Sequence, residues 1–290
     1  MRICIMAQEE PVCFSPFLRG IILDRPAEVV LVVLAGARGA GNHPRTLRER
    51  WEGLLTLWLI WEPAGFIRAL GIRVWFFILS RLGLLGSRLD RRSVRGVAQR
   101  LKIPIHETDD VRAPALLELL RTKEIDVVIN QGEILLGSDL LAVPKKGVVN
   151  RHASLLPRFR GRMGSFWAHA AEPPEYGVTI HFVDQGIDPG PIIAQRQVEL
   201  DPRWSYARVI DRLFAESASL MNAALDQLAR PDFTLRPNAH AATSPRRFQG
   251  LAAAPEYRRT LPQRRGRGPG AGGGAQTGAA AGGGKFTVWG

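Results

Sequence analysis

Apolar and polar residues alternate along this chain in blocks whose spacing predicts strands and helices in turn. Nearly uninterrupted apolar runs, typical of strands buried on both faces, cover residues 2–7, 28–34, 103–106 and 125–130. Between the last two, residues 114–121 combine leucines at helical spacing with a proline in the first turn, which predicts a helix. Buried strands separated by helices indicate a mostly parallel sheet covered by helices on both faces.

The second half of the pattern adds two strands and a long helix. Residues 176–184 and 191–200 carry β-branched residues in partial alternation, and the segment between them is rich in glycine, proline and aspartate, as tight loops require. An amphipathic helix is predicted to begin at Ser205 and to end before Pro231. We therefore expect a single three-layer α/β/α domain with a Rossmann-like, mostly parallel sheet over residues 1–235.

A hydrophobic helical insert of about residues 51–89 interrupts this pattern with runs rich in tryptophan and leucine. Neither run reaches the roughly 20 apolar residues that span a bilayer, and Glu62, Arg68, Arg73 and Arg81 interrupt them, so a transmembrane helix is not expected. Two interpretations stay open. A flap packed on the domain or at a dimer seam is favoured, and peripheral contact with a membrane or a lipid-linked substrate is the alternative.

The formal charge of +12 is concentrated towards the C-terminal end of the chain. From Thr234 onward there are nine lysines and arginines, and Glu256 is the only acid. Residues 236–290 are also rich in glycine, alanine and proline, a composition that buries too little surface to fold, so we expect a basic, largely disordered tail. Such a tail can contact RNA or anionic lipid, but a solvated appendage is the favoured interpretation.

Cysteine and histidine positions argue against metal and disulfide chemistry. Cys4 and Cys13 are the only cysteines, too few for a disulfide framework or a structural zinc site, and they favour a reducing, cytoplasmic location. His106 and His181 lack the helical spacing and acidic neighbours of a zinc pair, so we interpret both as structural. No metal is expected.

Polar residues follow several of the predicted strands, where open parallel sheets bind their ligands. Asn150 and His152 come at the end of one apolar run, and Asp188 lies in the loop between the strands at 176–184 and 191–200. An amide, an imidazole and a carboxylate brought together form a site that can polarise a carbonyl and move protons without a covalent enzyme intermediate. These three are the candidate catalytic residues.

Four motifs, in this order, resemble the folate-dependent formyltransferase family. They are Asn-x-His-x-Ser-Leu-Leu-Pro at residues 150–157, Arg-Phe-Arg-Gly at 158–161, Gly-Val-Thr-Ile-His at 177–181 and Asp-Pro-Gly-Pro-Ile-Ile at 188–193. That family includes glycinamide ribonucleotide transformylase, methionyl-tRNA formyltransferase and the sugar-nucleotide N-formyltransferases. The resemblance is strong from about residue 125 to residue 200 and implies a formyltransferase-like fold.

The resemblance implies transfer of a formyl group from 10-formyltetrahydrofolate, as co-substrate, to a primary amine. Asn150 would donate its amide to the formyl oxygen, His152 would face the same oxygen, and Asp188 would hold the imidazole and relay the amine's proton through a water. Backbone groups on either side of these residues would grip the pterin. The matched positions are Gly132, Ile134, Leu136, Asp184 and Gln185.

The identity of the amine acceptor is the least determined part of the resemblance. The ribonucleotide transformylases have a glycine-rich phosphate loop at the place of residues 7–11, which here contain two acids and no glycine. Two interpretations of these acids stay open: Glu9 or Glu10 contacts an amine or a sugar hydroxyl of the acceptor, or both are solvated residues at the end of a strand. We expect a small-molecule amine, an amino sugar or nucleotide-linked amino sugar. Methionyl-tRNA comes second, because the family's C-terminal tRNA-holding barrel has no recognisable counterpart here. The remaining alternatives are a formyltetrahydrofolate hydrolase and an inactive binding module on the same fold.

Overall fold

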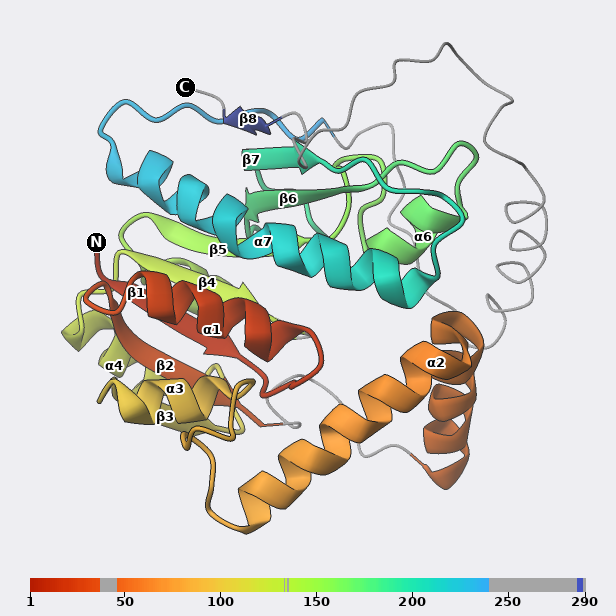
Figure 1. Cartoon of the computed structure of the whole chain (residues 1–290). Coiled ribbons are helices and arrows are strands. Elements are labelled where there is room, and N and C mark those ends of the chain that lie inside the picture. The colour runs from red at the N-terminus through yellow and green to blue at the C-terminus, as the bar shows by residue number, and fades with distance from the viewer. Residues whose placement is uncertain (37–45, 133, 135, 240–285, 289–290) are drawn as a thin grey trace.

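A computed structural model describes residues 1–36, 46–132, 134, 136–239 and 286–288 (Figure 1). Within these residues eight strands form one sheet in the order β3-β2-β1-β4-β5-β6-β7-β8. The first five in that order pair in parallel: β1 (Ile3–Ala7), β2 (Val29–Ala35), β3 (Ile105–Thr108), β4 (Val127–Gln131) and β5 (Gly147–His152). Antiparallel pairing then adds β6 (Gly177–Phe182), β7 (Ile192–Gln197) and β8 (Phe286–Val288).

Helices cover both faces of this sheet, as Figure 1 shows. On one face lie α1 (Phe14–Asp24), α3 (Val94–Arg100) and α7 (Tyr206–Ala229), which share a buried apolar cluster with β1 and β2. On the other face, α4 (Pro114–Thr122) and α5 (Ser138–Leu141) pack over a second cluster. The predicted three-layer fold with a mostly parallel sheet is confirmed. Continuous apolar runs such as that of β1 are buried at every position because both faces are covered.

Two acids after β1 hold the starts of helices. The Glu10 carboxylate accepts hydrogen bonds from the main-chain amides at the beginning of α1, including that of Cys13 at 2.7 Å. Glu9 does the same for α3, accepting from the amides of Val94 at 2.7 Å and Arg95 at 3.1 Å. Carboxylates are stabilised there by the unpaired N–H groups of a helix N-terminus. The suggestion that Glu9 or Glu10 meets an acceptor amine or hydroxyl is therefore corrected, since both carboxylates are engaged within the fold.

The hydrophobic insert is one long, bent helical element, α2 (Leu47–Arg81) (Figure 1). Glu62 has a positive φ of 59°, and Pro63 lacks an N–H to continue the helical ladder, so two limbs meet at this point. By length and composition Trp51–Arg81 is apolar enough to cross a membrane, contrary to the expectation from its two separate runs. Only 11% of the most apolar window is buried, so the insert packs on the domain over a small part of its surface, and its contact with a second copy or with a membrane stays a prediction.

Most of the predicted disordered tail, residues 240–285 and 289–290, lies outside the described residues. Beyond residue 235 the chain still contributes to the fold. Arg236 and Ile192 exchange two main-chain hydrogen bonds of 2.9 Å, and Asn238 is buried. The segment Phe286–Val288 forms β8 against β7. The fold therefore includes residues on the C-terminal side of the predicted domain boundary.

Candidate active site

Three polar side chains lie in one row across neighbouring strands. Asn130 of β4, Asn150 of β5 and His181 of β6 are partners in register, so their side chains share one face of the sheet. Each has a buried polar atom without a hydrogen-bond partner among the described residues, namely Oδ1 of Asn130, Oδ1 of Asn150 and Nε2 of His181. Because unsatisfied buried polar atoms are costly, this row is suited to receive the polar groups of a ligand.

Asp188 lies between two imidazole rings. Its Oδ2 is 3.6 Å from Nδ1 of His152, and its Oδ1 is 3.7 Å from Nε2 of His181. The two rings are nearly perpendicular, with centroids 6.2 Å apart. These separations exceed a direct hydrogen bond but are short enough for strong electrostatic coupling. The fold thus brings His152 and Asp188 together as predicted, and it adds His181, which sequence analysis had interpreted as structural.

Main-chain carbonyls decide which ring nitrogens carry a proton. Nε2 of His152 is 2.7 Å from the carbonyl oxygen of Phe159, and Nδ1 of His181 is 2.8 Å from that of Phe182. A carbonyl oxygen only accepts, so both nitrogens donate. The nitrogen of His152 that can exchange a proton with Asp188 is therefore Nδ1. Burial lowers the pKa of His181 to about 4, against the opposing attraction of Asp188, so this ring is neutral near pH 7 and its Nε2 presents a lone pair.

The same carbonyl organises the turn that follows β5. Ser154 is fully buried, and its hydroxyl donates to Phe159 O at 3.0 Å, so it supports this loop. The helix α6 (Gly164–Ala170) begins directly against the site. A Cβ at Gly164 would lie 2.5 Å from Nε2 of His152 and 2.5 Å from Phe159 O, so a side chain cannot fit there without displacing the imidazole or its partner.

Arg160 and Gly161 hold the Asp188 loop from the β5 side. The Arg160 guanidinium is buried and donates from Nε and Nη2 to the carbonyl oxygen of Ile187, at 3.1 and 2.7 Å. The main-chain amide of Gly161 donates to Asp188 Oδ2 at 2.7 Å. Asp188 itself has a positive φ of 48°, which is uncommon outside glycine and is maintained by surrounding contacts.

Asn238 holds the same loop from the C-terminal side. Its side-chain amide donates to the main-chain oxygens of Asp188 at 2.9 Å and Gly190 at 3.0 Å. Gly190 is needed at its position because a Cβ would lie 1.9 Å from the carbonyl oxygen of Phe182. Sequence reasoning missed Asn238 because contacts to main-chain oxygens leave no motif, and because it falls in the segment expected to be disordered.

The segment after β4 that was predicted to grip the pterin lies beside the polar row. Ile134 is buried in the cluster beneath α4 and α5, and Leu136 packs against it. The carbonyl oxygen of Ile134 accepts from Asn130 Nδ2 at 3.3 Å, which ties this segment to the row. Gly132 has a positive φ of 131° and lies beside Gln8, the residue that follows β1. Contact of these residues with a pterin stays a prediction.

The second predicted pterin segment follows β6. Val183 packs against the same cluster as Ile134, so the two segments meet at one part of the sheet. Asp184 and Gln185 are exposed, and the main-chain amide of Gln185 donates to Asp184 Oδ1 at 2.7 Å. Their role also stays a prediction. Among the described residues, no group of three or more His, Cys, Asp or Glu is placed to hold a metal ion.

Comparison by sequence relates about half of this chain to known proteins. Residues 88–225 match the family described as formyl transferase. The methionyl-tRNA formyltransferase of Trichlorobacter lovleyi is 37% identical over 145 residues, which cover 49% of this chain and 46% of that protein. The methionyl-tRNA formyltransferase of Roseiflexus sp. is 38% identical over 150 residues, 51% of this chain and 46% of that protein. The chain thus spans about half the length of these curated relatives.

Comparison by structure extends over more of the chain. The crystal structure of phosphoribosylglycinamide formyltransferase from Bacillus halodurans matches 80% of this chain and 99% of its own length, with a TM-score of 0.54 and 23% identity. The enzyme of the same name from Streptococcus pneumoniae matches 79% of this chain and 99% of its own, with a TM-score of 0.51 and 21% identity. At these identities the likeness shows a shared fold.

Proposed function

Residues 88–225 of this chain belong to the formyl transferase family, and on that premise we propose that the protein transfers a formyl group from 10-formyltetrahydrofolate to a primary amine. The observation that carries the proposal is the cluster at the end of β5. Asn150, His152 and Asp188 lie within the matched segment, and Asp188 is 3.6 Å from the imidazole of His152. Acyl transfer to an amine requires a donor that stabilises the oxyanion and groups that transfer a proton, and an amide beside a coupled carboxylate and imidazole can supply both.

The polar row suits the co-substrate. Asn130 Oδ1, Asn150 Oδ1 and His181 Nε2 are buried acceptors without hydrogen-bond partners among the described residues, and the N–H groups of a formylated pterin can donate to such atoms. When bound, 10-formyltetrahydrofolate supplies the formyl carbon that the amine attacks. We assign its pterin to the segments that contain Gly132 to Leu136 and Val183 to Gln185, which share one apolar cluster through Ile134, Leu136 and Val183.

Asn150 stabilises the charge that develops during attack. Its side-chain amide makes no hydrogen bond to the part of the chain that the structure describes, so the carboxamide can turn its N–H₂ towards the formyl oxygen. A donor that is already in place costs no reorganisation when the oxygen becomes negative, and loss of one such donor typically slows a reaction about 10²- to 10³-fold. His152 is less suited to this contact, because its Nε2 already donates to Phe159 O.

Asp188 and His152 transfer the proton that the attacking amine loses. The amine nitrogen forms a bond to the formyl carbon, the bond from that carbon to the folate nitrogen breaks, and the proton lost by the amine ends on the leaving nitrogen. Asp188 Oδ2 and His152 Nδ1 face each other and can hold that proton in between. The Asp188 carboxylate stabilises an imidazolium, whose second N–H is already satisfied by Phe159 O.

We assign a small amine, an amino sugar or nucleotide-linked amino sugar, as the first acceptor to test. Glu9 and Glu10 occupy the turn after β1 and cap helices, which leaves no glycine-rich cradle for a phosphate there. Methionyl-tRNA is the second candidate, supported by the names of the relatives that are 37% and 38% identical. We place the activity in the cytoplasm, in agreement with two buried, free cysteines.

Release of tetrahydrofolate tests the proposal. The full chain is incubated with 10-formyltetrahydrofolate and, separately, nucleotide-linked amino sugars, methionyl-tRNA and glycinamide ribonucleotide. Acceptor-dependent release is the expected result. Release of formate without any acceptor would instead identify a hydrolase, and folate binding without turnover would identify a binding module; either contradicts the proposal.

A further inference from the structure

The second limb of α2, residues 63–81, meets the rest of the molecule along a narrow strip. Ala69 and Leu79 are buried, and Ile72 between them is half-buried. Ala69 and Ile72 belong to the apolar cluster that joins α2 to α6 and α7. These positions recur at helical spacing, so they form one line along the limb. The remainder of its circumference faces away from the domain.

Two ion pairs fix which side of the limb faces outward. Arg68 Nη2 is 2.7 Å from Asp211 of α7, and Arg73 Nη2 is 2.9 Å from Glu10. Both acids belong to the folded domain, and Glu10 also caps α1. Because the arginines turn towards the domain, the apolar side chains between them are presented to the outside.

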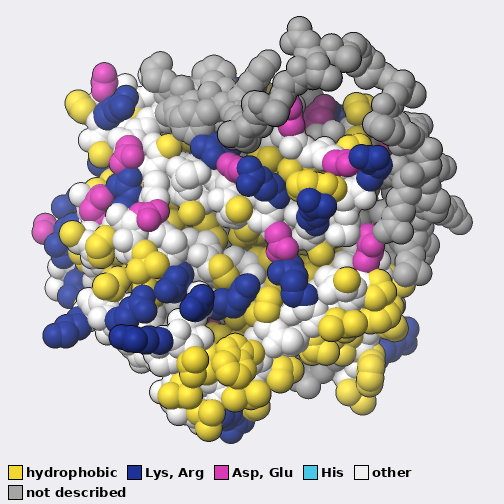
Figure 2. Space-filling view, in the orientation of Figure 1, with side chains coloured by type: hydrophobic (Ala, Val, Ile, Leu, Met, Phe, Trp, Pro, Cys, Tyr) yellow, Lys and Arg dark blue, Asp and Glu magenta, His cyan; other side chains and the backbone are white. Residues whose placement is uncertain are grey.

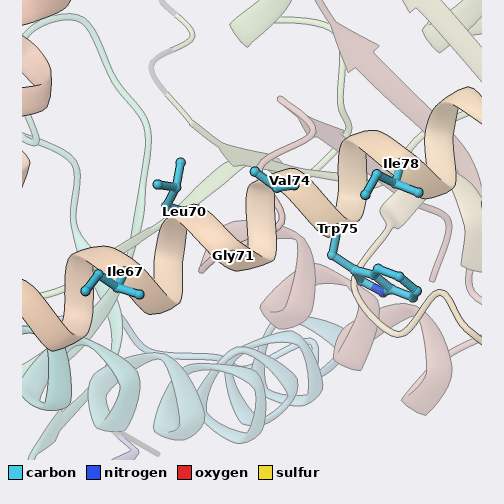
Figure 3. Close-up of a pocket in the computed structure, with 6 residues that line it drawn as sticks. All are labelled: Ile67, Leu70, Gly71, Val74, Trp75 and Ile78. Carbon is cyan, nitrogen blue, oxygen red and sulfur yellow. The ribbon is translucent and has the colours of Figure 1, made fainter.

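The outward side is unusually apolar for a surface. Six large apolar side chains of this limb are each between 39% and 61% exposed, although water disfavours such contiguous exposure: Ile67, Leu70, Val74, Trp75, Phe77 and Ile78. Five of these, together with Gly71, line a shallow groove along the helix (Figure 3). We call these six apolar residues together with Gly71 the outer face of α2. Exposed apolar faces of this extent mark contact surfaces.

Basic side chains border the outer face. From Pro63 to Leu89 the chain contains four arginines and no acid. Arg81 lies over the ring of Phe77 at 4.9 Å, and Arg81 and Arg88 are exposed and make no ion pair with the described residues. Figure 2 shows hydrophobic side chains gathered at the lower edge of the molecule, where α2 lies, with lysines and arginines beside them. An apolar face bordered by cations is the pattern of a helix that lies on anionic lipid.

We propose that the outer face of α2 docks this protein onto a bilayer surface that contains anionic lipids. The helix lies in the interface and does not cross it. Crossing would require Arg68 and Arg73 to leave their partners in the domain and enter hydrocarbon, which is costly, whereas lying flat keeps both ion pairs. Trp75 suits this position, because tryptophan rings favour the boundary between hydrocarbon and water.

Charge favours lipid over a second copy of the chain as the occupant. Pairing two outer faces would bring together two segments that each contain four arginines and no acid from Pro63 to Leu89, and the chain as a whole carries a formal charge of +12. An anionic leaflet attracts the same groups, by roughly 1 kcal/mol for each basic residue close to the surface. The docked helix also shares an apolar cluster with α6, whose first residue, Gly164, lies beside His152.

Vesicle binding by the full chain tests this proposal independently of activity. The protein is sedimented with phosphatidylcholine vesicles that contain or lack phosphatidylglycerol. The test variant is Trp75→Glu combined with Ile78→Glu, and the matched control is Leu23→Glu combined with Leu101→Glu, which alters two exposed apolar residues outside α2 by the same charge. Both variants keep the basic tail, so its attraction to lipid is common to all samples. Far-UV circular dichroism and the thermal midpoint verify folding.

We expect the wild type to bind phosphatidylglycerol vesicles and to bind less at high salt. Partitioning of the Trp75→Glu, Ile78→Glu variant should fall at least about tenfold, and that of the control should change little. Absence of wild-type binding, or equal losses in both variants, would overturn the proposal. So would a dimer seen by light scattering without lipid that the α2 substitutions abolish, because a second copy would then occupy the outer face.

Discussion

Asn238 donates its side-chain amide to the main-chain oxygens of Asp188 and Gly190, at 2.9 and 3.0 Å. Among the candidate catalytic residues, Asp188 is the one with a positive φ, and this contact joins it to a residue 50 positions later in the chain. Asn238 lies outside the matched family segment, residues 88–225. The carboxylate of Asp188 is therefore positioned in part by a residue that carries no family motif.

We expect Asn238→Ala to lower kcat about tenfold, with little change in KM for 10-formyltetrahydrofolate, because it removes two hydrogen bonds that orient the Asp188 loop and none to substrate. Asn238→Asp should be at least as harmful, since a carboxylate cannot donate to carbonyl oxygens. Steady-state kinetics with a thermal melt separates positioning from general instability. Asn222→Ala, which removes an amide bonded to Asp24 far along α1, is the control. Unchanged kcat in both Asn238 variants would show that this contact does not position Asp188.

We expect Gly164→Ala to abolish most activity and lower the thermal midpoint. The added Cβ would lie 2.5 Å from His152 Nε2 and from Phe159 O, so the imidazole or the loop must move. Gly71→Ala is the matched control, because a Cβ there meets nothing within 4 Å and alanine is favoured in a helix by about 1 kcal/mol. The melt and the kcat of the two variants are compared side by side; a Gly164→Ala protein with wild-type turnover would contradict the close packing at His152.

The stability of the fold should fall as pH drops from about 6.5 to about 4. Burial lowers the pKa of His181 from 6.5 to about 4, so within this window the unfolded chain binds a proton that the folded chain does not. Stability from the neutral ring is complete above the unfolded pKa and is lost towards the folded one. Urea unfolding at several pH values measures it. In His181→Gln the slope across this window should be smaller than in the wild type; equal slopes in the two proteins would reject the assignment.

The strands were predictable because a strand that is buried on both faces requires a long run of apolar residues. β1 and β4 fall within one or two residues of their expected ranges. The alternation of such runs with helices also predicted the layers. The motif at residues 150–157 pointed to His152 and the motif at residues 188–193 pointed to Asp188, and the two side chains lie 3.6 Å apart. These features depend on local composition or on motifs that the chain carries explicitly.

What could not be predicted depends on contacts between distant segments. His181 joins the site only because β6 pairs antiparallel with β5 in a register that aligns it with Asn150. Glu9 and Glu10 are engaged by helix N-termini that lie beside the end of β1 in space, and periodicity does not encode that proximity. The two apolar runs of the insert join across Glu62 into one helical element, whose outer face depends on ion pairs with α7 and Glu10.

In the function proposed for this protein, Asp188 and His152 together move the proton in formyl transfer. The most direct measurement is the rate of tetrahydrofolate release by Asp188→Asn at saturating acceptor, alongside its affinity for 10-formyltetrahydrofolate. Asparagine keeps the shape of the side chain and removes its charge. We expect turnover to fall about 10²- to 10⁴-fold while folate affinity stays close to that of the wild type. Turnover equal to the wild type, with folate still bound, would contradict the account.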